Sequence, residues 1–447
     1  MLKLLQTGTA LLAIGICGVA QADTLDEALA KAYLGSPRLQ ARQALLRSID
    51  EQVAQAHAGW RPTLNGSATA ERAFQTPLSG GSGVTHPRNL GLQLSQPLLR
   101  LQTYPEVVAA KRAVDSARAD LVSQEQQLLF DTVSAYVNVL RDLAVLDLQK
   151  NNEQVLQKQL DATRDRFRVG EITRTDVSQS ESRLAAATAE RILAEGVLES
   201  SRANYVRVIG DAPKEVKKPE INLALPKTLD EAVAFAEGAN PDVMAAKSAF
   251  EQSDQQVDST LAALLPRIDL IGSAARGYDQ SAALPQKTDT YAIGVRATIP
   301  LYQGGADYAR TRQAKQTRSQ RQLELEETRR RAHEAAVRAW QQYQSALAAI
   351  ESRKSAVESN KIALKGTQQE AKVGTRTTLD VLNAEQEFLT AQVNLVRAEH
   401  DAVVAAYQIM AATGKLTAAE LKLPVTLYDP QKHYDSVAGK WIGVGGR

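Results

Sequence analysis

The apolar and polar residues alternate one by one in four short segments: residues 63–71, 89–95, 267–274 and 291–299. In the last of these, Tyr291, Ile293 and Val295 occupy every second position. A period of two is typical of a β-strand with one apolar and one polar face. The pattern therefore predicts four strands in two pairs, joined by polar, Gly- and Pro-rich loops at Gln75 to Pro87 and Asp279 to Thr290.

Strong helix formers fill most of the remaining chain. The segment 25–58 is interrupted by Pro37, which predicts a kink or a new start of the helix. Residues 106–169 contain neither Gly nor Pro, and residues 306–373 are broken only by Gly366. A helix of 64 residues is about 96 Å long. These two segments predict helices far longer than a compact domain needs.

Both long helices are predicted to end at a Val-Gly pair and to turn back. Gly170 and Gly374 are typical of the residue that follows a helix C-terminus. Thr173 and Thr377, each followed by an aspartate three residues later, are expected to begin the return helices. Each long helix is therefore one arm of a helical hairpin.

The chain contains an internal repeat. The sequence Thr-Leu-Asp-Glu-Ala at residues 24–28 recurs at 228–232, and the same offset of 204 carries Gly170 onto Gly374 and Asp176 onto Asp380. Each repeat predicts the order helix, two strands, very long helix, helix. The predicted divisions of the chain are a first repeat, a linker, a second repeat and a tail, at residues 23–210, 211–227, 228–414 and 415–447.

The first 22 residues have the pattern of an export signal. Lys3 precedes ten apolar residues at 10–19, and Ala20-Gln21-Ala22 provides small residues for cleavage. Ten apolar residues are too few to span a bilayer. Cys17 follows Ile16, whereas a lipoprotein signal has a small residue there, so we expect a cleaved signal peptide without a lipid.

Composition narrows the function classes. The chain has 53 Lys and Arg against 51 Asp and Glu, which argues against nucleic acid as a partner. Its only cysteine lies in the predicted signal, which excludes disulfides and cysteine-based catalysis from the mature chain. His333-Glu334 lacks the second histidine of a zinc motif, because position 337 is Val337. We expect no enzymatic activity, no cofactor and no metal site.

The four strands allow two interpretations. A small soluble β-domain would bury one face. Alternatively, export, segments of about ten residues and aromatic residues near the strand ends indicate strands that cross an outer membrane. Four strands cannot close a barrel, and open edges are not tolerated in a membrane. The second interpretation therefore needs several copies, of which two would give eight strands and three would give twelve. The aromatic residues near the strand ends are Trp60, Phe74, Tyr104, Tyr278, Tyr291 and Tyr302.

The order of these elements resembles the TolC outer-membrane factor family. The resemblance covers nearly the whole mature chain and is carried in duplicate by Gln96-Pro97-Leu98-Leu99 and Ile299-Pro300-Leu301-Tyr302, and by the turns at 166–170 and 372–382. It implies a mainly α protein with a transmembrane β-barrel portion. Four strands per chain would enter a twelve-stranded barrel shared by a homotrimer, in contact with outer membrane lipid and continued by a long α-helical barrel in the periplasm.

The resemblance also implies function and site residues. The channel would be the exit duct of a tripartite efflux pump or of a type I protein secretion system, working with a periplasmic adaptor and an inner-membrane pump or ABC transporter. The tail at 415–447 would lie at the equator of the helical barrel. The tips implied to contact the adaptor are Val169, Gly170, Glu171, Val373, Gly374 and Thr375. The periplasmic gate is implied at Thr175, Asp176, Arg376, Asp380 and Asn383.

In this gate Thr175 and Asp176 of one hairpin would pair with Arg376 of another, and Asp380 would form an acidic ring. Three positions differ from the family pattern. Glu171 stands where an apolar residue is common, Ala371 replaces the gate tyrosine, and Asn383 replaces a second ring aspartate. A weaker latch and weaker block by multivalent cations are expected.

The gate residues and the channel function each have an alternative interpretation. Asp176 and Asp380 could simply be favourable charges at helix N-termini. A soluble periplasmic coiled-coil adaptor or scaffold is the alternative function, because it would explain the long helices and the export but not the strands. The sequence does not identify the cargo.

Overall fold

The computed structural model describes residues 24–75, 83–219, 223–279 and 287–445. The predicted signal peptide at 1–22 lies outside this part of the chain. The first repeat contains α1 (Leu25–Gly35), α2 (Pro37–His57), the short 3-10 helix η1 (Ala58–Trp60), β1 (Thr63–Ala70), β2 (Ala73–Gln75), β3 (Gly83–Thr85), β4 (Arg88–Leu99), α3 (Thr103–Arg168) and α4 (Arg174–Ile209). The second contains α5 (Leu229–Ala239), α6 (Pro241–Ala262), β5 (Arg267–Tyr278), β6 (Thr288–Thr298), α7 (Ala306–Lys372) and α8 (Thr378–Ala412), and α9 (Pro430–Val437) lies in the tail.

Local sequence explains where the first helices begin. The Thr24 hydroxyl accepts a hydrogen bond from the backbone N–H of Glu27 at 3.3 Å, and the Glu27 carboxylate accepts one from the N–H of Thr24. This is the expected capping box. Ser36 caps α2, and Pro37 occupies its first turn, where its missing N–H costs nothing. Pro37 therefore restarts the helix, as predicted.

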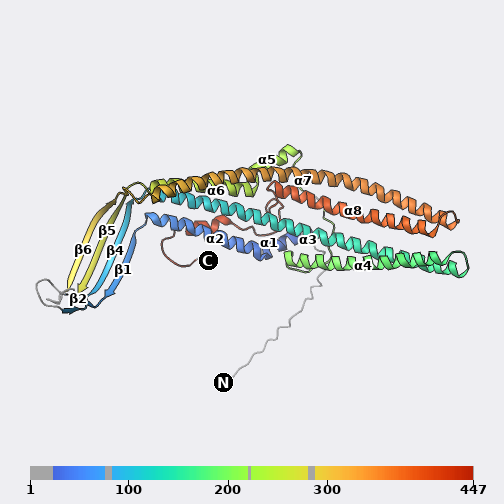
Figure 1. Ribbon diagram of the computed structural model, residues 1–447, viewed down its shortest axis with the longest axis horizontal. Helices are drawn as coiled ribbons and strands as arrows, with labels where there is room; N and C mark the ends of the chain where they lie inside the picture. The colour runs from blue at the N-terminus through green and yellow to red at the C-terminus, as the bar shows by residue number, and fades with distance from the viewer. Residues whose placement is uncertain (1–23, 76–82, 220–222, 280–286, 446–447) are drawn as a thin grey trace, which may run out of the picture. The chain divides into compact units, whose positions relative to one another are not determined.

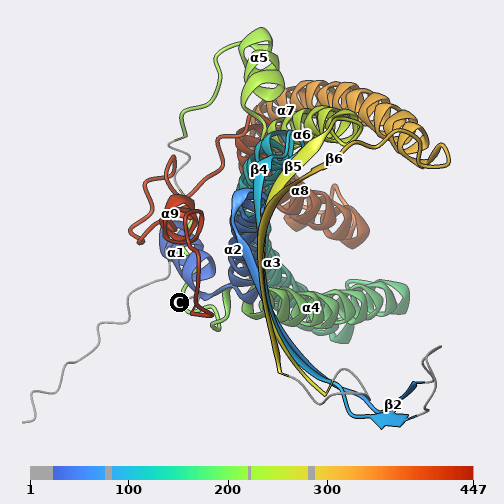
Figure 2. The same cartoon turned by 90° about the vertical axis from the view of Figure 1, so that its left-hand side faces the viewer.

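The four predicted strands form one antiparallel sheet with the order β1-β4-β5-β6. Its register aligns the alternation of all four strands, so that Gly66 lies opposite Leu92, Leu92 opposite Ala274, and Ala274 opposite Tyr291. One face therefore carries the apolar set of every strand. Their neighbours along each strand, such as Ser67 and Gln93, point to the other face, which is polar or small apart from Ile271. Figures 1 and 2 show these strands side by side in a curved sheet.

The loop predicted at Gln75 to Pro87 contains more structure than expected. β2 and β3 pair as a small separate sheet, with Phe74 opposite Val84. The second loop is shorter than expected, because β6 begins at Thr288. The four predicted strands are all present, and β2 and β3 are two further strands that the pattern did not predict. The missed strands are three residues each, too short for a period of two to be recognised.

The long helices are present as predicted. α3 has 66 residues and α7 has 67. No helix in the described ranges combines the length and the apolarity needed to cross a membrane. The chain divides into two compact units that do not follow the repeats, since α3, α7 and α8 contribute residues to both. The first unit includes residues 24–35, 131–219 and 350–400, and the second includes 36–75, 83–130, 223–279, 287–349 and 401–445.

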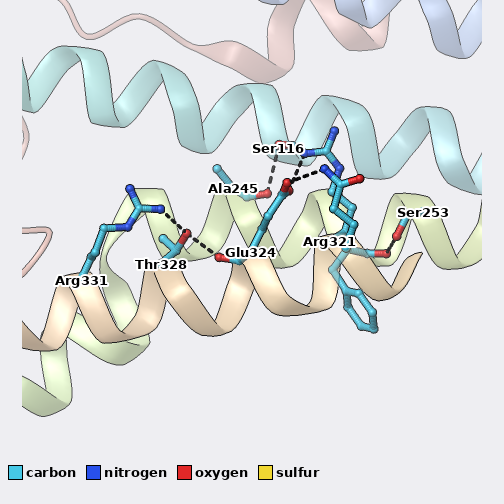
Figure 3. A network of polar contacts seen from close by, with 9 residues as sticks. Ser116, Ala245, Ser253, Arg321, Glu324, Thr328 and Arg331 are labelled. Atoms are coloured by element: carbon cyan, nitrogen blue, oxygen red, sulfur yellow. Dashed lines mark hydrogen bonds and ion pairs between the residues drawn. The ribbon is translucent and has the colours of Figure 1, made fainter. Parts of the chain in front are cut away.

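In the second unit, the apolar stripe of α7 packs on α5 and α6. Leu325 and Ala336 form a buried cluster with Ala236 of α5 and Val243 of α6. The exposed side of α7 has pairs of oppositely charged residues. In one of them, Glu324 accepts a hydrogen bond from Arg321 at 2.8 Å (Figure 3). The three arginines at 329–331 belong to this solvated face, where Arg329 pairs with Glu326 and Arg331 with Glu327.

In the first unit, the linker after α4 is attached to α3 by a buried tyrosine. The Tyr136 hydroxyl donates to the Lys217 carbonyl at 2.8 Å and accepts from the Lys217 N–H at 2.9 Å. Its ring lies 6.4 Å from that of Tyr205 on α4. A side chain of the long helix therefore holds the linker at Lys217.

The tail lies on α2 within the second unit, and both views place α9 beside that helix. The imidazole Nδ1 of His433 lies 3.0 Å from the carboxylate of Asp50, which is fully buried. The Arg118 guanidinium covers the ring of Tyr434, and Arg61 donates to the Lys440 carbonyl at 2.5 Å. These polar contacts attach the tail to helices far from it in the sequence.

We predict that His433→Ala loosens the tail, because it leaves the buried Asp50 carboxylate without its imidazole partner. An unsatisfied buried acceptor costs about 1–3 kcal/mol. Limited proteolysis should cut the tail faster, and the thermal midpoint should fall. His86→Ala, at an exposed position, is the control. Equal protease resistance of wild type and His433→Ala would show that this contact does not hold the tail.

Candidate functional site at the hairpin turns

The two hairpin turns have the same backbone geometry. Gly170 and Gly374 adopt φ values of 80° and 83°, the left-handed region that glycine occupies without a Cβ clash. The N–H of Glu171 donates to the Arg166 carbonyl at 3.0 Å, and the N–H of Thr375 donates to the Glu370 carbonyl at 3.0 Å. This six-to-one bond, with the five-to-two bond beside it, is a Schellman motif. The repeat thus builds two equivalent tips.

The tips present apolar side chains to solvent. Val169 is 72% exposed and Val373 is 76% exposed. Gly170, Glu171, Gly374 and Thr375 are exposed beside them. A valine side chain this exposed contributes little to the stability of the fold. All six residues implied to contact an adaptor therefore lie at an accessible surface in the single chain.

Both return helices begin with the same cap. The Asp176 carboxylate accepts hydrogen bonds from the N–H and hydroxyl of Thr173 at 3.0 and 2.8 Å. Asp380 accepts the equivalent bonds from Thr377 at 2.9 and 2.8 Å. In one chain, these aspartates are thus first-turn capping residues. Their predicted roles in a latch and a ring concern contacts between copies and stay predictions.

The second tip carries an ion pair that the first lacks. The Arg376 Nε donates to the Glu370 carboxylate at 2.9 Å. At the equivalent positions of the first repeat stand Ile172 and Arg166. The hydrogen bond to Glu370, with the charges of Glu370 and Asp380, raises the pKa of Arg376 above its usual value. Arg376 therefore stays charged, and within one chain its partner is Glu370.

Asn383 has a partner on the neighbouring return helix. The Arg183 Nη2 of α4 donates to its side-chain oxygen at 2.9 Å. Thr175 is exposed next to the Asp176 cap. Neither Glu370 nor Arg183 was predicted from the sequence as a partner of these residues. The opposite charge of Glu370, six residues before Arg376, was a signal for their ion pair. Nothing in the local pattern indicates that Arg183 contacts Asn383, which lies 200 residues away.

The chain matches the family described as "Outer membrane efflux protein" over residues 28–211 and again over 235–415. It is 35% identical over 426 residues to the outer membrane efflux protein BepC of Brucella suis biovar 1 (strain 1330), covering 95% of this chain and 92% of BepC. It is 23% identical to the outer membrane protein TolC of Escherichia coli (strain K12), covering 94% and 88%.

The fold agrees with solved channel structures. The Campylobacter jejuni CmeC outer membrane channel superposes with a TM-score of 0.79 at 16% identity, covering 93% of this chain and 89% of that one. The helices, the sheet and the duplicated order therefore define a channel of the TolC-like fold class, in which a β-barrel continues into a helical barrel.

The chain belongs to the outer membrane efflux protein family. Its place is the outer membrane, with the helical part in the periplasm. The predicted resemblance, fold class and location are thus confirmed.

We predict that Asp380 stabilises the second hairpin in a pH-dependent way. Hydrogen bonds from the Thr377 N–H and hydroxyl, with the nearby charge of Arg376, lower the pKa of Asp380 below its usual 3.8. Because the folded state favours the ionised form, the stabilisation is complete well above pH 3.8 and disappears as the pH falls through the lowered value.

The measurement is the thermal midpoint of wild type and Asp380→Asn across this pH range. The wild type should be more stable at neutral pH, and the two midpoints should converge in acid. A difference that is the same at every pH would show that the carboxylate charge is not responsible.

Proposed function

We propose that three copies of this chain form a channel through the outer membrane that carries substrates out of the cell. The channel would be the exit duct of a tripartite efflux pump or a type I secretion system. The channel would transport substrates and would not act as an enzyme. The observation that supports this most strongly is the sheet, which has two faces of opposite polarity and two unpaired edges.

The faces of the sheet suit lipid on one side and water on the other. Leu92, Ile293 and Val295 are 55%, 82% and 64% exposed in one chain, so they have no partner in their own core. Outer-membrane strands alternate in this way, with apolar residues toward lipid and polar residues toward the lumen. The apolar face would contact outer membrane lipid, and the small and polar face would line the duct.

The edges of the sheet supply the argument for assembly. β1 and β6 are the outer strands, and each has one side without a strand partner in the described sheet. In hydrocarbon, unpaired backbone N–H and C=O groups cost several kcal/mol each. Joining β6 of one copy to β1 of the next satisfies them. Three copies give twelve strands and leave room for a lumen, whereas eight-stranded barrels are filled by side chains.

The hairpin tips are the proposed docking points for a periplasmic adaptor, which would connect the duct to an inner-membrane pump or ABC transporter. Val169 and Val373 provide apolar contacts, and the glycines beside them let a partner approach the backbone. Glu171 replaces an apolar residue at the first tip. We therefore assign more of the contact to Val373, Gly374 and Thr375.

The same tips would form the gate. Thr175 and Asp176 of one hairpin would pair with Arg376 of the next, and Asp380 would form a ring of three carboxylates. In the single chain Arg376 is bound to Glu370, so assembly would have to share or exchange that contact. Ala371 removes a latch hydroxyl, and Asn383 removes a second ring of charge. The latch is therefore proposed to be weak.

Disulfide cross-links between the sheet edges test the assembly. With Cys17 in the predicted signal, the mature chain has no cysteine of its own. Ser67→Cys on β1 would be combined in turn with cysteine at Thr290, Ala292 or Gly294 on β6, all on the same face. At least one pair should give covalent bands of two and three chains on a denaturing gel.

The control pair is Ser67→Cys with Gly91→Cys. These residues are opposite each other in β1 and β4 of one chain, so their bridge should leave a single-chain band. If no edge pair links chains, or if the purified protein conducts no current in a planar bilayer, the proposal of a trimeric channel is wrong. A soluble chain would favour the coiled-coil scaffold.

The proposed ring predicts block by trivalent cations from the periplasmic side. Three carboxylates around a narrow mouth attract cations, so Asp380→Asn should need a blocking concentration at least ~10-fold higher. Asn383→Asp adds a second ring and should lower that concentration. Single-channel conductance with hexaamminecobalt(III) measures both. Equal block of all three proteins would remove the ring from the proposal.

A further inference from the structure

A cavity of about 430 Å³ lies within the first compact unit, among α3, α4 and α8. Its wall includes no residue of the sheet and none of the tip residues at 169–171 and 373–375, although Arg183 in the wall contacts Asn383. Its wall has an apolar part and a polar part. The lining residues that the argument uses are Leu156, Leu382, Leu389, Gln149, Arg183 and Glu385.

Two hydrogen-bond acceptors in this wall are buried without a donor. Glu385 is 6% exposed, and its Oε2 has no hydrogen-bond partner among the described residues. Its carboxylate accepts one bond, from the Gln368 amide at 3.4 Å. Gln149 Oε1, on the facing helix α3, is also buried without a partner. Buried acceptors are rarely left unpaired, so the cavity suits an occupant that carries donors.

The charge of the wall favours a cation. α4 contributes Arg183 and Glu190, α8 contributes Glu385, and α3 contributes no charged residue to the lining. The wall therefore holds two carboxylates against one guanidinium, and that guanidinium already donates to Asn383 at 2.9 Å. Burial raises the pKa of Glu385. A cation beside it would favour its ionised form again.

The size and chemistry of the wall favour an organic cation. The described residues contain no group of three or more His, Cys, Asp or Glu side chains suited to a metal ion. The volume falls in the range of small-molecule pockets, whose walls are largely apolar with a few placed polar groups. Leu156, Leu382 and Leu389 provide such an apolar surface beside the two acceptors.

We propose that this cavity binds a small amphipathic amine, whose ammonium group donates to Glu385 Oε2 and Gln149 Oε1 while its apolar body lies against the three leucines. The site belongs to one chain and goes beyond the proposed duct. It would place a binding site for organic cations in the wall of the helical part, whatever cargo passes through the lumen.

The test is isothermal titration calorimetry of the full-length protein in detergent with benzylamine. Glu385→Gln keeps the shape and removes the charge, so benzylamine affinity should fall at least ~10-fold. Gln149→Leu should weaken binding by a smaller factor. Glu387→Gln, an exposed carboxylate two residues along the same helix, is the matched control and should bind as wild type does.

Benzyl alcohol, which has the same ring without the charge, should bind far more weakly than benzylamine. Equal binding of benzylamine to wild type and Glu385→Gln, or equal binding of the alcohol and the amine, would overturn the proposal. So would the absence of benzylamine binding to wild type. Planar-bilayer conductance of the wild type is measured separately, which distinguishes failure of this site from failure of the duct.

Discussion

The pairing of backbone groups along β1 and β6 is the constraint on which the proposed assembly depends. A four-stranded sheet satisfies its two inner strands and leaves one side of each outer strand open. In water that edge could remain hydrated, but in the outer membrane no solvent can pair it. One chain is therefore incomplete in its membrane part. The proposed trimer would supply the missing hydrogen bonds at both edges.

The internal repeat makes this sheet and the helical tips from the same pattern used twice. β1 and β4 come from the first repeat, β5 and β6 from the second, and the register between β4 and β5 joins them with their apolar faces aligned. The Schellman turns and caps at the tips are equally duplicated. The repeats differ in charge, however. Only the second tip has the Arg376–Glu370 pair, so the two tips are equivalent in backbone and unequal in electrostatics.

At the tips, residues with a proposed role between copies already have a role within one chain. Asp176 and Asp380 cap helices, and Arg376 binds Glu370. Such contacts would hold each side chain near the position from which it could reach a neighbour. Because these pairs are exposed, each contributes little to stability, and exchanging one exposed partner for another costs little. A gate built from them could open and close at modest free-energy cost.

The helices, the four main strands, the turns and the repeat could all be predicted from the amino-acid sequence. These depend on periodicity, caps and glycine positions, which act over a few residues, as at Thr24, Pro37 and Gly374. The family resemblance added candidate tip and gate residues. It could not indicate Arg183 beside Asn383, His433 beside Asp50, or the two unpaired acceptors at Glu385 and Gln149. Those pairs lie up to 383 residues apart, and only the packing of distant helices brings such groups together and removes their water.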